Sequence, residues 1–485
     1  MEIEEDADEN SFVSYLSSAS LNVKDYMERD HDAFFETALL SIQSDICRNP
    51  NAPGYDMKIP PATHWEAMAW HDTEVWRKVE EKELTLLKDM GVYEEVDALP
   101  EGRKAIRCRW VYEFKLHKSG EPPMAKARLV TQGFSQIPYM DYNTTFAPVT
   151  KSVSVQFVTV YSVLQGWHLN CFDATRAFLW GDLAVIIYMH RPPGLARGFW
   201  QLLKLLYGLK QASLIWYRLL RKVLEALGFV CSQFDHAIFI FKHTWQSKMV
   251  HCLLTMHVDD GLSGCNSKDF LAFIKSEIKK AFGIKDLGPV KTFLNSQFEW
   301  DHATHELWIH QQMYIESLLE EHNLTNCNAV LTPLDPNHPL GNDTDIYPEV
   351  ENLTKSYQHL VGSLLFLQIC TCPDITFAVL TLSQFCFAPL PHHYTAARQV
   401  LHYLKGTKTY CLHYGSAKWD QPLLGLSDAD WAGDKAGRAS ISGFVWTMSG
   451  GPVSWSAKKQ NCIALSSTEA KYVALTRAVQ EGMWI

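Results

Sequence analysis

Two adjacent aspartates, Asp259 and Asp260, follow the almost continuous apolar run 252–258, and a second apolar stretch begins at Leu262. With Gly261, this pattern predicts a β-hairpin whose turn carries Asp-Asp-Gly. The flanking residues are too apolar for an exposed hairpin, so we expect buried strands. Two carboxylates on such a turn repel each other unless a cation lies between them. Mg²⁺ beside a phosphate substrate is the usual solution for carboxylate sites.

The same hairpin, taken alone, also fits a solvated Asp-Gly turn, which is common. Asp173 supplies a third carboxylate, at the end of the predicted strand 167–172 and before a short helical pattern. It is either a helix N-cap or a partner of the two hairpin aspartates. Three carboxylates that hold two Mg²⁺ ions are the arrangement that nucleotidyl transfer requires. The sequence alone leaves open whether Asp173 approaches Asp259.

Length and composition indicate a globular protein of about three domains. The chain has 485 residues, of which 47% are hydrophobic and 20% charged. No apolar stretch approaches the roughly 20 residues of a membrane span, and the acidic start is unlike a secretory signal. The twelve cysteines contain no C-x-x-C pair. We therefore expect reduced thiols in an intracellular protein, cytoplasmic or nuclear and not secreted.

The net charge of −10 argues against a nucleic-acid partner only superficially. Residues 1–36 contain eleven acidic and two basic residues, which leaves 42 basic against 43 acidic residues in the rest of the chain. Within that rest, residues 103–128 hold eight basic residues against two acidic ones. Such a local basic patch is suited to phosphate binding, whatever the total charge. The alternative is a solvated strand face.

Changes in pattern along the chain predict its organisation. Residues 1–60 are acidic, end in Pro-rich sequence and are expected to be disordered. Another Pro- and Asn-rich stretch at 330–350 marks a boundary, and helical patterns resume after it. From residue 421 the pattern changes to four short strands, of which the last is 461–465, and then to a helix.

Many short motifs, in a characteristic order and spacing, resemble the reverse transcriptase of copia-type LTR retrotransposon polyproteins, followed by the start of an RNase H. The resemblance extends from about Trp65 to the last residue. The motifs that carry it lie at residues 110–115, 126–130, 141–142, 145–149, 172–179, 206–212, 361–365, 373–375, 427–434, 454–455, 458–460 and 465–470. Each motif is weak alone, but their number and order make chance a poor explanation.

The resemblance implies an α+β right-hand polymerase fold with an antiparallel palm sheet. It divides the chain into an acidic leader (1–60), a reverse transcriptase with fingers, palm and thumb (61–335), a connection region (336–420) and a truncated RNase H-like α/β domain (421–485). It implies RNA-directed DNA polymerase activity with two Mg²⁺ ions, which Mn²⁺ can replace. The implied partners are an RNA template, a DNA primer and dNTPs.

The resemblance also implies roles for single residues. Asp173, Asp259 and Asp260 match the metal-binding carboxylates of the palm. Lys126 and Arg128 match residues near the incoming triphosphate. Phe178 matches the bulky residue that excludes a ribonucleotide 2′-hydroxyl, or it is a core aromatic. Lys210 and Gln211 are further candidates for template or nucleotide contacts.

The RNase H-like part retains fewer of the expected residues. Asp428 and Glu469 match the first two carboxylates of that domain, but Ser466 and Glu469 also form the S-x-x-E pattern of a capping box. The resemblance calls for a further Asp beyond Ile485, so we expect no RNase H activity. Lys471 stands where the family more often has Glu.

Three readings of function remain from the sequence. The complete carboxylate triad favours a metal-dependent polymerase. Departures from the family pattern, such as His257 in place of Tyr, favour instead a catalytically silent relic that at most binds nucleic acid. A metal-dependent nuclease rests on the carboxylates alone and ranks last. The sequence does not indicate the oligomeric state.

Overall fold

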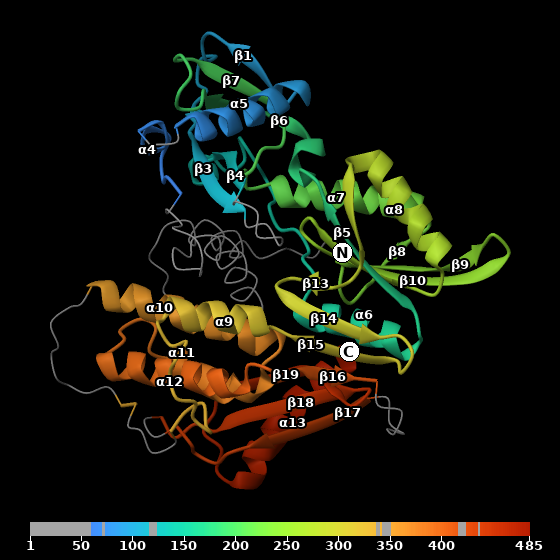
Figure 1. Cartoon of the computed structure of the whole chain (residues 1–485), viewed down its shortest axis with the longest axis vertical. Helices are drawn as coiled ribbons and strands as arrows, with labels where there is room; N and C mark the ends of the chain where they lie inside the picture. Colours follow the sequence, from blue (N-terminus) through green and yellow to red (C-terminus); the bar gives the residue numbers. More distant parts are fainter. Residues whose placement is uncertain are drawn as a thin grey trace.

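The computed structural model describes residues 60–69, 73–115, 124–335, 340–341, 351–415, 423–434 and 437–485. Except for Pro60, the predicted acidic leader lies outside these ranges. The described chain forms an elongated molecule with three regions along its long axis (Figure 1). The first strands and helices lie at one end, a large antiparallel sheet lies in the middle, and helices with a smaller sheet lie at the other end.

The central sheet is antiparallel and has six strands. In spatial order they are β12 (Ile284–Pro289), β5 (His168–Ala174), β11 (Asp260–Cys265), β10 (Lys248–His257), β9 (Ile238–Trp245) and β8 (Val230–Cys231). The apolar character of β10 on both faces is explained by the layers that cover it, because a strand buried on both faces reads as a near-continuous apolar run. This sheet is the palm of the right-hand fold that the sequence predicted.

Helices cover both faces of the palm sheet. One face packs against α7 (Ala212–Ala226) and α8 (Lys268–Phe282), in a core that includes Trp216, Phe270 and Met256. The other face packs against α6 (Ser152–Leu164). The backbone of β11 lies close to α6, since a Cβ at Gly264 of β11 would lie 1.9 Å from the Ser162 hydroxyl. The sheet therefore has fixed layers on either side of the strands that carry the aspartates.

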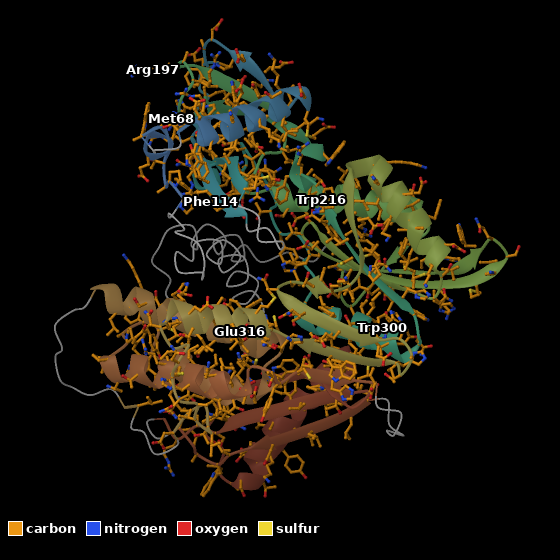
Figure 2. All side chains as sticks on the ribbon, viewed as in Figure 1. Met68, Phe114, Arg197, Trp216, Trp300 and Glu316 are labelled. Carbon is orange, nitrogen blue, oxygen red and sulfur yellow. The ribbon has the colours of Figure 1, made fainter. Side chains whose placement is uncertain are left out.

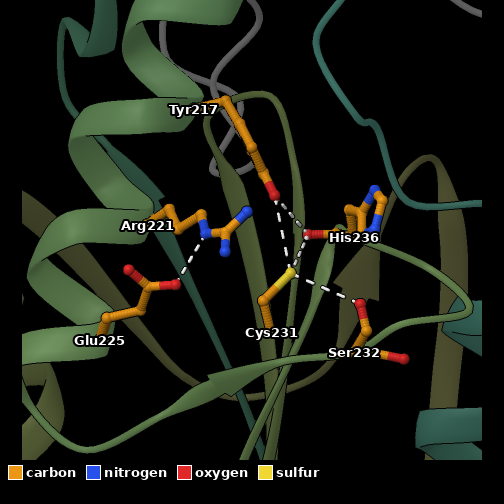
Figure 3. A network of polar contacts seen from close by, with 6 residues as sticks. All are labelled: Tyr217, Arg221, Glu225, Cys231, Ser232 and His236. Atoms are coloured by element: carbon orange, nitrogen blue, oxygen red, sulfur yellow. Dashed lines mark hydrogen bonds and ion pairs between the residues drawn. The ribbon is translucent and has the colours of Figure 1, made fainter. Parts of the chain in front are cut away.

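A polar network fastens α7 to the edge of the palm sheet (Figure 3). The Tyr217 hydroxyl donates to the carbonyl of His236 at 2.9 Å and lies 3.7 Å from the Cys231 thiol. On the same helix, Arg221 pairs with Glu225 one turn later at 2.7 Å. Because the Tyr217 contacts join the helix to β8 and to the turn before β9, they help to fix the position of α7.

The fingers region begins before the palm in the sequence, and two of its strands lie between the palm strands β5 and β8 along the chain. Its sheet has the order β1 (Tyr93–Val96), β7 (Phe199–Lys204), β6 (Asp182–His190) and β2 (Ala105–Ile106). A separate hairpin is formed by β3 (Cys108–Lys115) and β4 (Met124–Thr131), and helices α4 (His64–Met68) and α5 (Thr73–Asp89) accompany it. All of these elements except β1 contribute buried side chains to one core, to which Tyr93 of β1 adds a partly buried ring. The predicted basic hairpin is thus part of a rigid unit.

Four helices after the palm share a single hydrophobic core. They are α9 (Gln312–Glu321), α10 (Glu351–Cys370), α11 (Thr376–Ser383) and α12 (Pro391–Thr407). This core includes Ile315 and Leu318 on one side of the expected boundary at 335/336, and Leu364 and Leu401 on the other. The expected division between reverse transcriptase and connection therefore does not separate two cores.

Two further sheets complete the described chain. One has the order β13 (Thr292–Phe293), β14 (Ser296–Asp301), β15 (Glu306–His310) and β16 (Leu412–Tyr414), and the other β17 (Leu423–Ala429), β18 (Ile441–Met448) and β19 (Gly451–Lys459). Helix α13 (Ser467–Trp484) packs against the last sheet. The fourth strand predicted at 461–465 is wrong. Those residues form the loop into α13, and the Ala464 carbonyl accepts from the Trp431 indole at 3.1 Å.

No helix within the described ranges is both long and apolar enough to cross a lipid bilayer.

A close backbone contact joins the fingers hairpin to the start of α7. The backbone N–H and the hydroxyl of Thr131 both donate to the Tyr207 carbonyl, at 2.7 and 3.0 Å. The next residue, Gly208, has a φ of 89°, and a Cβ there would lie 2.2 Å from the Thr131 carbonyl oxygen. Only glycine fits this conformation and this space without strain.

We predict that Gly208→Ala lowers the free energy of unfolding by about 2 kcal/mol or more, because a left-handed backbone and an overpacked contact both add cost. Gly102→Ala is the matched control, since Gly102 has a φ of 77° with nothing within 4 Å of an added Cβ. Denaturant unfolding of both variants measures the difference. Equal losses would contradict the importance of this contact.

Candidate active site

The turn of the β10–β11 hairpin holds the two adjacent aspartates in place. His257 pairs with Asp260, so Val258 and Asp259 form a two-residue loop. Val258 has a φ of 58°, and such a value in a β-branched residue is a strained conformation that its surroundings must maintain. The Trp216 indole donates to the Val258 carbonyl at 2.7 Å, and the Ala174 N–H donates to the Asp259 carbonyl at 2.7 Å. Figure 2 shows Trp216 where α7 meets the palm.

The structure brings the third aspartate to the other two. In the ladder between β5 and β11, Asp173 lies directly opposite Asp260. Paired residues of antiparallel strands project from the same face, with Cβ atoms about 4.5–5.5 Å apart. Asp173 is not a helix N-cap, because the short helix that follows, η3 (Ala177–Trp180), has Arg176 at that position. The three carboxylates therefore form one cluster.

Burial and mutual repulsion make ionisation of this cluster costly. Burial, followed by the charges of Asp259 and Asp173, raises the pKa of Asp260 to about 7. Burial and the charge of Asp173 also raise the pKa of Asp259. A carboxyl in such surroundings keeps its proton at a pH where an ordinary aspartate has lost it. A cation bound between these carboxyls would favour their ionised form.

The fingers hairpin presents two cations toward this cluster. Lys126 and Arg128 lie on one face of β4, and the charges of both lower the pKa of Asp259, against the larger effect of burial. Arg128 also pairs with Glu113 at 3.2 Å, and its guanidinium lies 5.7 Å from the centre of the Tyr207 ring. Cations of this kind can bind a triphosphate that lies over the carboxylates.

Phe178 lies between the palm and fingers cores. It is half-buried and packs at the edge of both. Its ring meets the Tyr207 ring edge-to-face, with the centroids 5.4 Å apart. Tyr207 therefore contacts both Phe178 and Arg128, and it joins two of the predicted nucleotide-binding residues. The core position and the predicted steric role are compatible here.

Lys210 and Gln211 contact a neighbouring loop rather than the carboxylates. The Lys210 ammonium donates to the Tyr142 hydroxyl at 3.0 Å. Gln211 is buried, and its amide donates to the Asp141 carbonyl at 2.9 Å and accepts from Gln136 at 3.0 Å. Because these internal bonds occupy both ends of the Gln211 amide, its contacts indicate a structural role.

Two charged residues of the site were missed from the sequence. Arg176 follows Asp173 by three residues, is exposed and has a left-handed φ of 61°. Glu83 comes from α5, and burial raises its pKa while the charges of Lys126, Arg128 and Arg176 oppose that rise. The sequence signal that could have identified Arg176 is its position three residues after Asp173. Glu83 gave none, since it reads as an ordinary residue of an amphipathic helix.

His257 lies behind the carboxylates rather than on the surface. Its side chain is buried, and this burial lowers its pKa to about 4, so the imidazole is neutral at pH 7. It borders a cavity of about 630 Å³ that α6, α10, β14, β19 and α13 also line. The cavity is of ligand size, and it separates the palm from the C-terminal sheet.

The two RNase H candidates have contacts of their own. Asp428 is exposed and pairs with Lys471 at 3.2 Å. Glu469 caps the start of α13: its carboxylate accepts from the Leu465 N–H at 2.6 Å, and its own N–H donates to the Ser466 hydroxyl at 3.1 Å. The capping alternative for Glu469 is therefore confirmed. The cation that pairs with the Asp428 carboxylate is therefore a lysine of the chain itself, Lys471.

Comparison with known proteins identifies the family. Residues 91–336 match the family model of the reverse transcriptase (RNA-dependent DNA polymerase). This chain belongs to the reverse transcriptase family. The Pol polyprotein of transposon TNT 1-94 from Nicotiana tabacum is 34% identical over 435 residues, which are 88% of this chain and 32% of the polyprotein. A putative transposon Ty5-1 protein of Saccharomyces cerevisiae is 32% identical over 64% of this chain and 99% of its own length.

Two further comparisons are with another plant polyprotein and with a solved structure. The Pol polyprotein of transposon RE1 from Arabidopsis thaliana is 33% identical over 90% of this chain and 30% of its own length. This reverse transcriptase thus spans about a third of the two plant polyproteins. The solved foamy viral protease–reverse transcriptase in complex with double-stranded DNA is 11% identical, with a TM-score of 0.46 over 96% of this chain and 73% of that one.

The raised pKa of Asp260 predicts how the stability of the metal-free protein depends on pH. A carboxyl whose pKa is higher in the folded than in the unfolded state stabilises the fold at low pH and loses that contribution as it ionises. The free energy of unfolding should therefore fall between about pH 4, the ordinary aspartate value, and about pH 7. The loss is at most about 1.4 kcal/mol per pH unit.

Asp260→Asn removes this titration, so its stability should vary less across the same range. Denaturant midpoints, measured in the presence of a chelator, test the difference. Asp269→Asn changes an exposed aspartate at the start of α8 and should retain the wild-type pH dependence. Parallel curves for wild type and Asp260→Asn would contradict the raised pKa.

Proposed function

We propose that this chain is an RNA-directed DNA polymerase that adds dNTPs to the 3′-hydroxyl of a primer. The observation that carries the proposal is the placement of Asp173 opposite Asp260, with Asp259 on the adjoining turn. Asp173 and Asp260 come from paired strands, and Asp259 lies on the turn that joins β10 to β11. Such a cluster is the requirement for phosphoryl transfer with two metal ions.

Asp173, Asp259 and Asp260 would hold two Mg²⁺ ions, for which Mn²⁺ can substitute. The donor set fits, because carboxylate oxygens are the ligands that Mg²⁺ prefers, and a bound cation would relieve the repulsion among the carboxylates that raises the pKa values of Asp259 and Asp260. When bound, the ions activate the attacking hydroxyl and neutralise charge on the phosphate. The chain contributes the rigid spacing of the carboxylates, which the Trp216 and Ala174 hydrogen bonds maintain.

The incoming dNTP would lie between the palm and the fingers hairpin. Lys126 and Arg128 face the carboxylates from β4, and we assign them to the triphosphate. Arg176, which is exposed beside Asp173, is a third cation for this group. The Phe178 ring contacts the Tyr207 ring, which in turn lies beside the Arg128 guanidinium. We assign Phe178 to the exclusion of the ribonucleotide 2′-hydroxyl.

The RNA template and DNA primer would approach the same cluster. A hybrid of this kind is bound mostly through phosphates and 2′-hydroxyls, so its affinity falls as salt rises. Lys210 is the remaining candidate for a template contact, since its ammonium is only partly buried. Gln211 supports the loop that carries Lys210 through its bonds to Gln136 and Asp141.

The C-terminal region would then be RNase H-like without nuclease activity. This proposal is supported by the contacts of its two candidate carboxylates. Asp428 pairs with Lys471, and Glu469 is used as a helix cap. Two carboxylates engaged in this way do not form a cluster comparable to that of the palm.

Primer extension on an RNA template tests the polymerase directly. With a DNA primer, dNTPs and Mg²⁺, wild type should extend the primer. Asp259→Asn and Asp260→Asn should each lower the rate by at least about a hundredfold, because each removes a carboxylate that would hold the metal ions. Gel or fluorescence analysis of the products gives the rate.

Asp269→Asn is the matched control and should extend the primer at the wild-type rate, since this residue lies on the outer helix α8. Absence of extension by folded wild type, with Mn²⁺ also tried, would refute the polymerase and favour the silent relic. Unchanged extension by both palm variants would refute the assigned carboxylates.

A further inference from the structure

Three helices meet around a group of metal-binding side chains far from the palm. Glu321 ends α9, His322 follows it, and His359 lies on α10. One potential ligand atom from each residue lies within 4.8 Å of the others, and the Glu321 carboxylate is 3.4 Å from Nδ1 of His359. Figure 1 shows α9, α10 and α12 packed together in this region. The side chains are therefore already gathered before any ion binds.

The two ring nitrogens of His322 have different surroundings. Its Nδ1 lies 3.5 Å from the hydroxyl of Tyr394 on α12. Its Nε2 is buried and has no hydrogen-bond partner among the described residues. A buried polar atom of this kind is costly unless something binds it. Metal-binding histidines commonly use one nitrogen for the ion and the other for a hydrogen bond that fixes the ring.

Access and charge at this cluster suit a cation. The side chains of Glu321 and His359 are 34% and 38% exposed, so an ion can enter and retain water at an open position. The Glu321 carboxylate supplies the negative charge. Arg398 is the nearby cation, and its guanidinium is directed to the His322 carbonyl at 3.3 Å rather than to the ring.

We propose that Glu321, His322 and His359 bind a divalent transition-metal ion, with Zn²⁺ the best fit. Two imidazoles and one carboxylate with a water molecule complete a tetrahedral zinc site. Imidazole nitrogens disfavour Mg²⁺ and Ca²⁺, which require oxygen ligands. The ion would fasten the end of α9 to α10, while Tyr394 couples the site to α12. It is separate from the proposed palm ions and independent of polymerase activity.

Titration of the full chain with Co²⁺ and then Zn²⁺, in excess Mg²⁺, tests the site. Coordinated Co²⁺ absorbs visible light, and Zn²⁺ should displace it. His359→Ala should weaken binding at least about tenfold, which is the loss that removal of even an outer contact can cause. Because the His359 side chain is only partly buried, the substitution should leave the fold intact, and circular dichroism of the variant checks the fold.

His402→Ala is the matched control, because His402 lies on α12 of the same bundle and bonds to the Asn328 carbonyl at 2.8 Å. It should bind as wild type does, and so should Asp259→Asn with Asp260→Asn, since the palm is not involved. Zn²⁺ should also raise the thermal midpoint of wild type but not of His359→Ala. Equal affinity of wild type and His359→Ala would overturn the proposal.

Discussion

Electrostatic repulsion among three aspartates is the constraint on which the rest of this structure depends. Asp173 and Asp260 face each other across a strand pair, and Asp259 adjoins them on a strained turn. This arrangement costs free energy, because burial and like charge both oppose ionisation of the three carboxyl groups. The surrounding structure supplies the restraint. The Trp216 indole binds the Val258 carbonyl, and helices cover both faces of the sheet.

The fingers hairpin places two cations near this group of carboxylates. Lys126 and Arg128 reach toward Asp259 because β4 is fixed to the palm through Thr131 and the Tyr207 carbonyl. The absence of a side chain at Gly208 permits this contact. The positive charges of the fingers hairpin thus act on the anionic cluster from a position that this backbone contact helps to fix. A triphosphate with its metal ions carries charges that complement both sides.

Much of this arrangement was predictable from the sequence, and the reason lies in local pattern. The apolar run before Asp259 predicted a buried strand and a hairpin after it. The predicted Asp-Asp-Gly turn is displaced by one residue, because Val258 and Asp259 form the loop while Asp260 and Gly261 belong to β11. Contacts between distant segments were not predictable in this way. The pairing of Asp173 with Asp260 and the position of Glu83 depend on strand order and helix packing, which no local pattern encodes.

The differences from expectation have the same origin. Gln211 lies in a motif of the family, yet its amide is occupied by Gln136 and the Asp141 carbonyl. The stretch 461–465 has strand-like composition, but the cap of α13 and the Trp431 indole hold it as a loop. The shared core of α9 and α10 crosses a boundary that composition alone suggested. In each case tertiary contacts decided between alternatives that the sequence left open.

The most direct test of the central claim is the location of metal in a crystal of the protein with primer, template, dNTP and Mn²⁺. Anomalous scattering should show two Mn²⁺ ions about 4 Å apart between Asp173 and the Asp259–Asp260 turn. A ternary complex in which neither ion contacts these carboxylates would contradict the account.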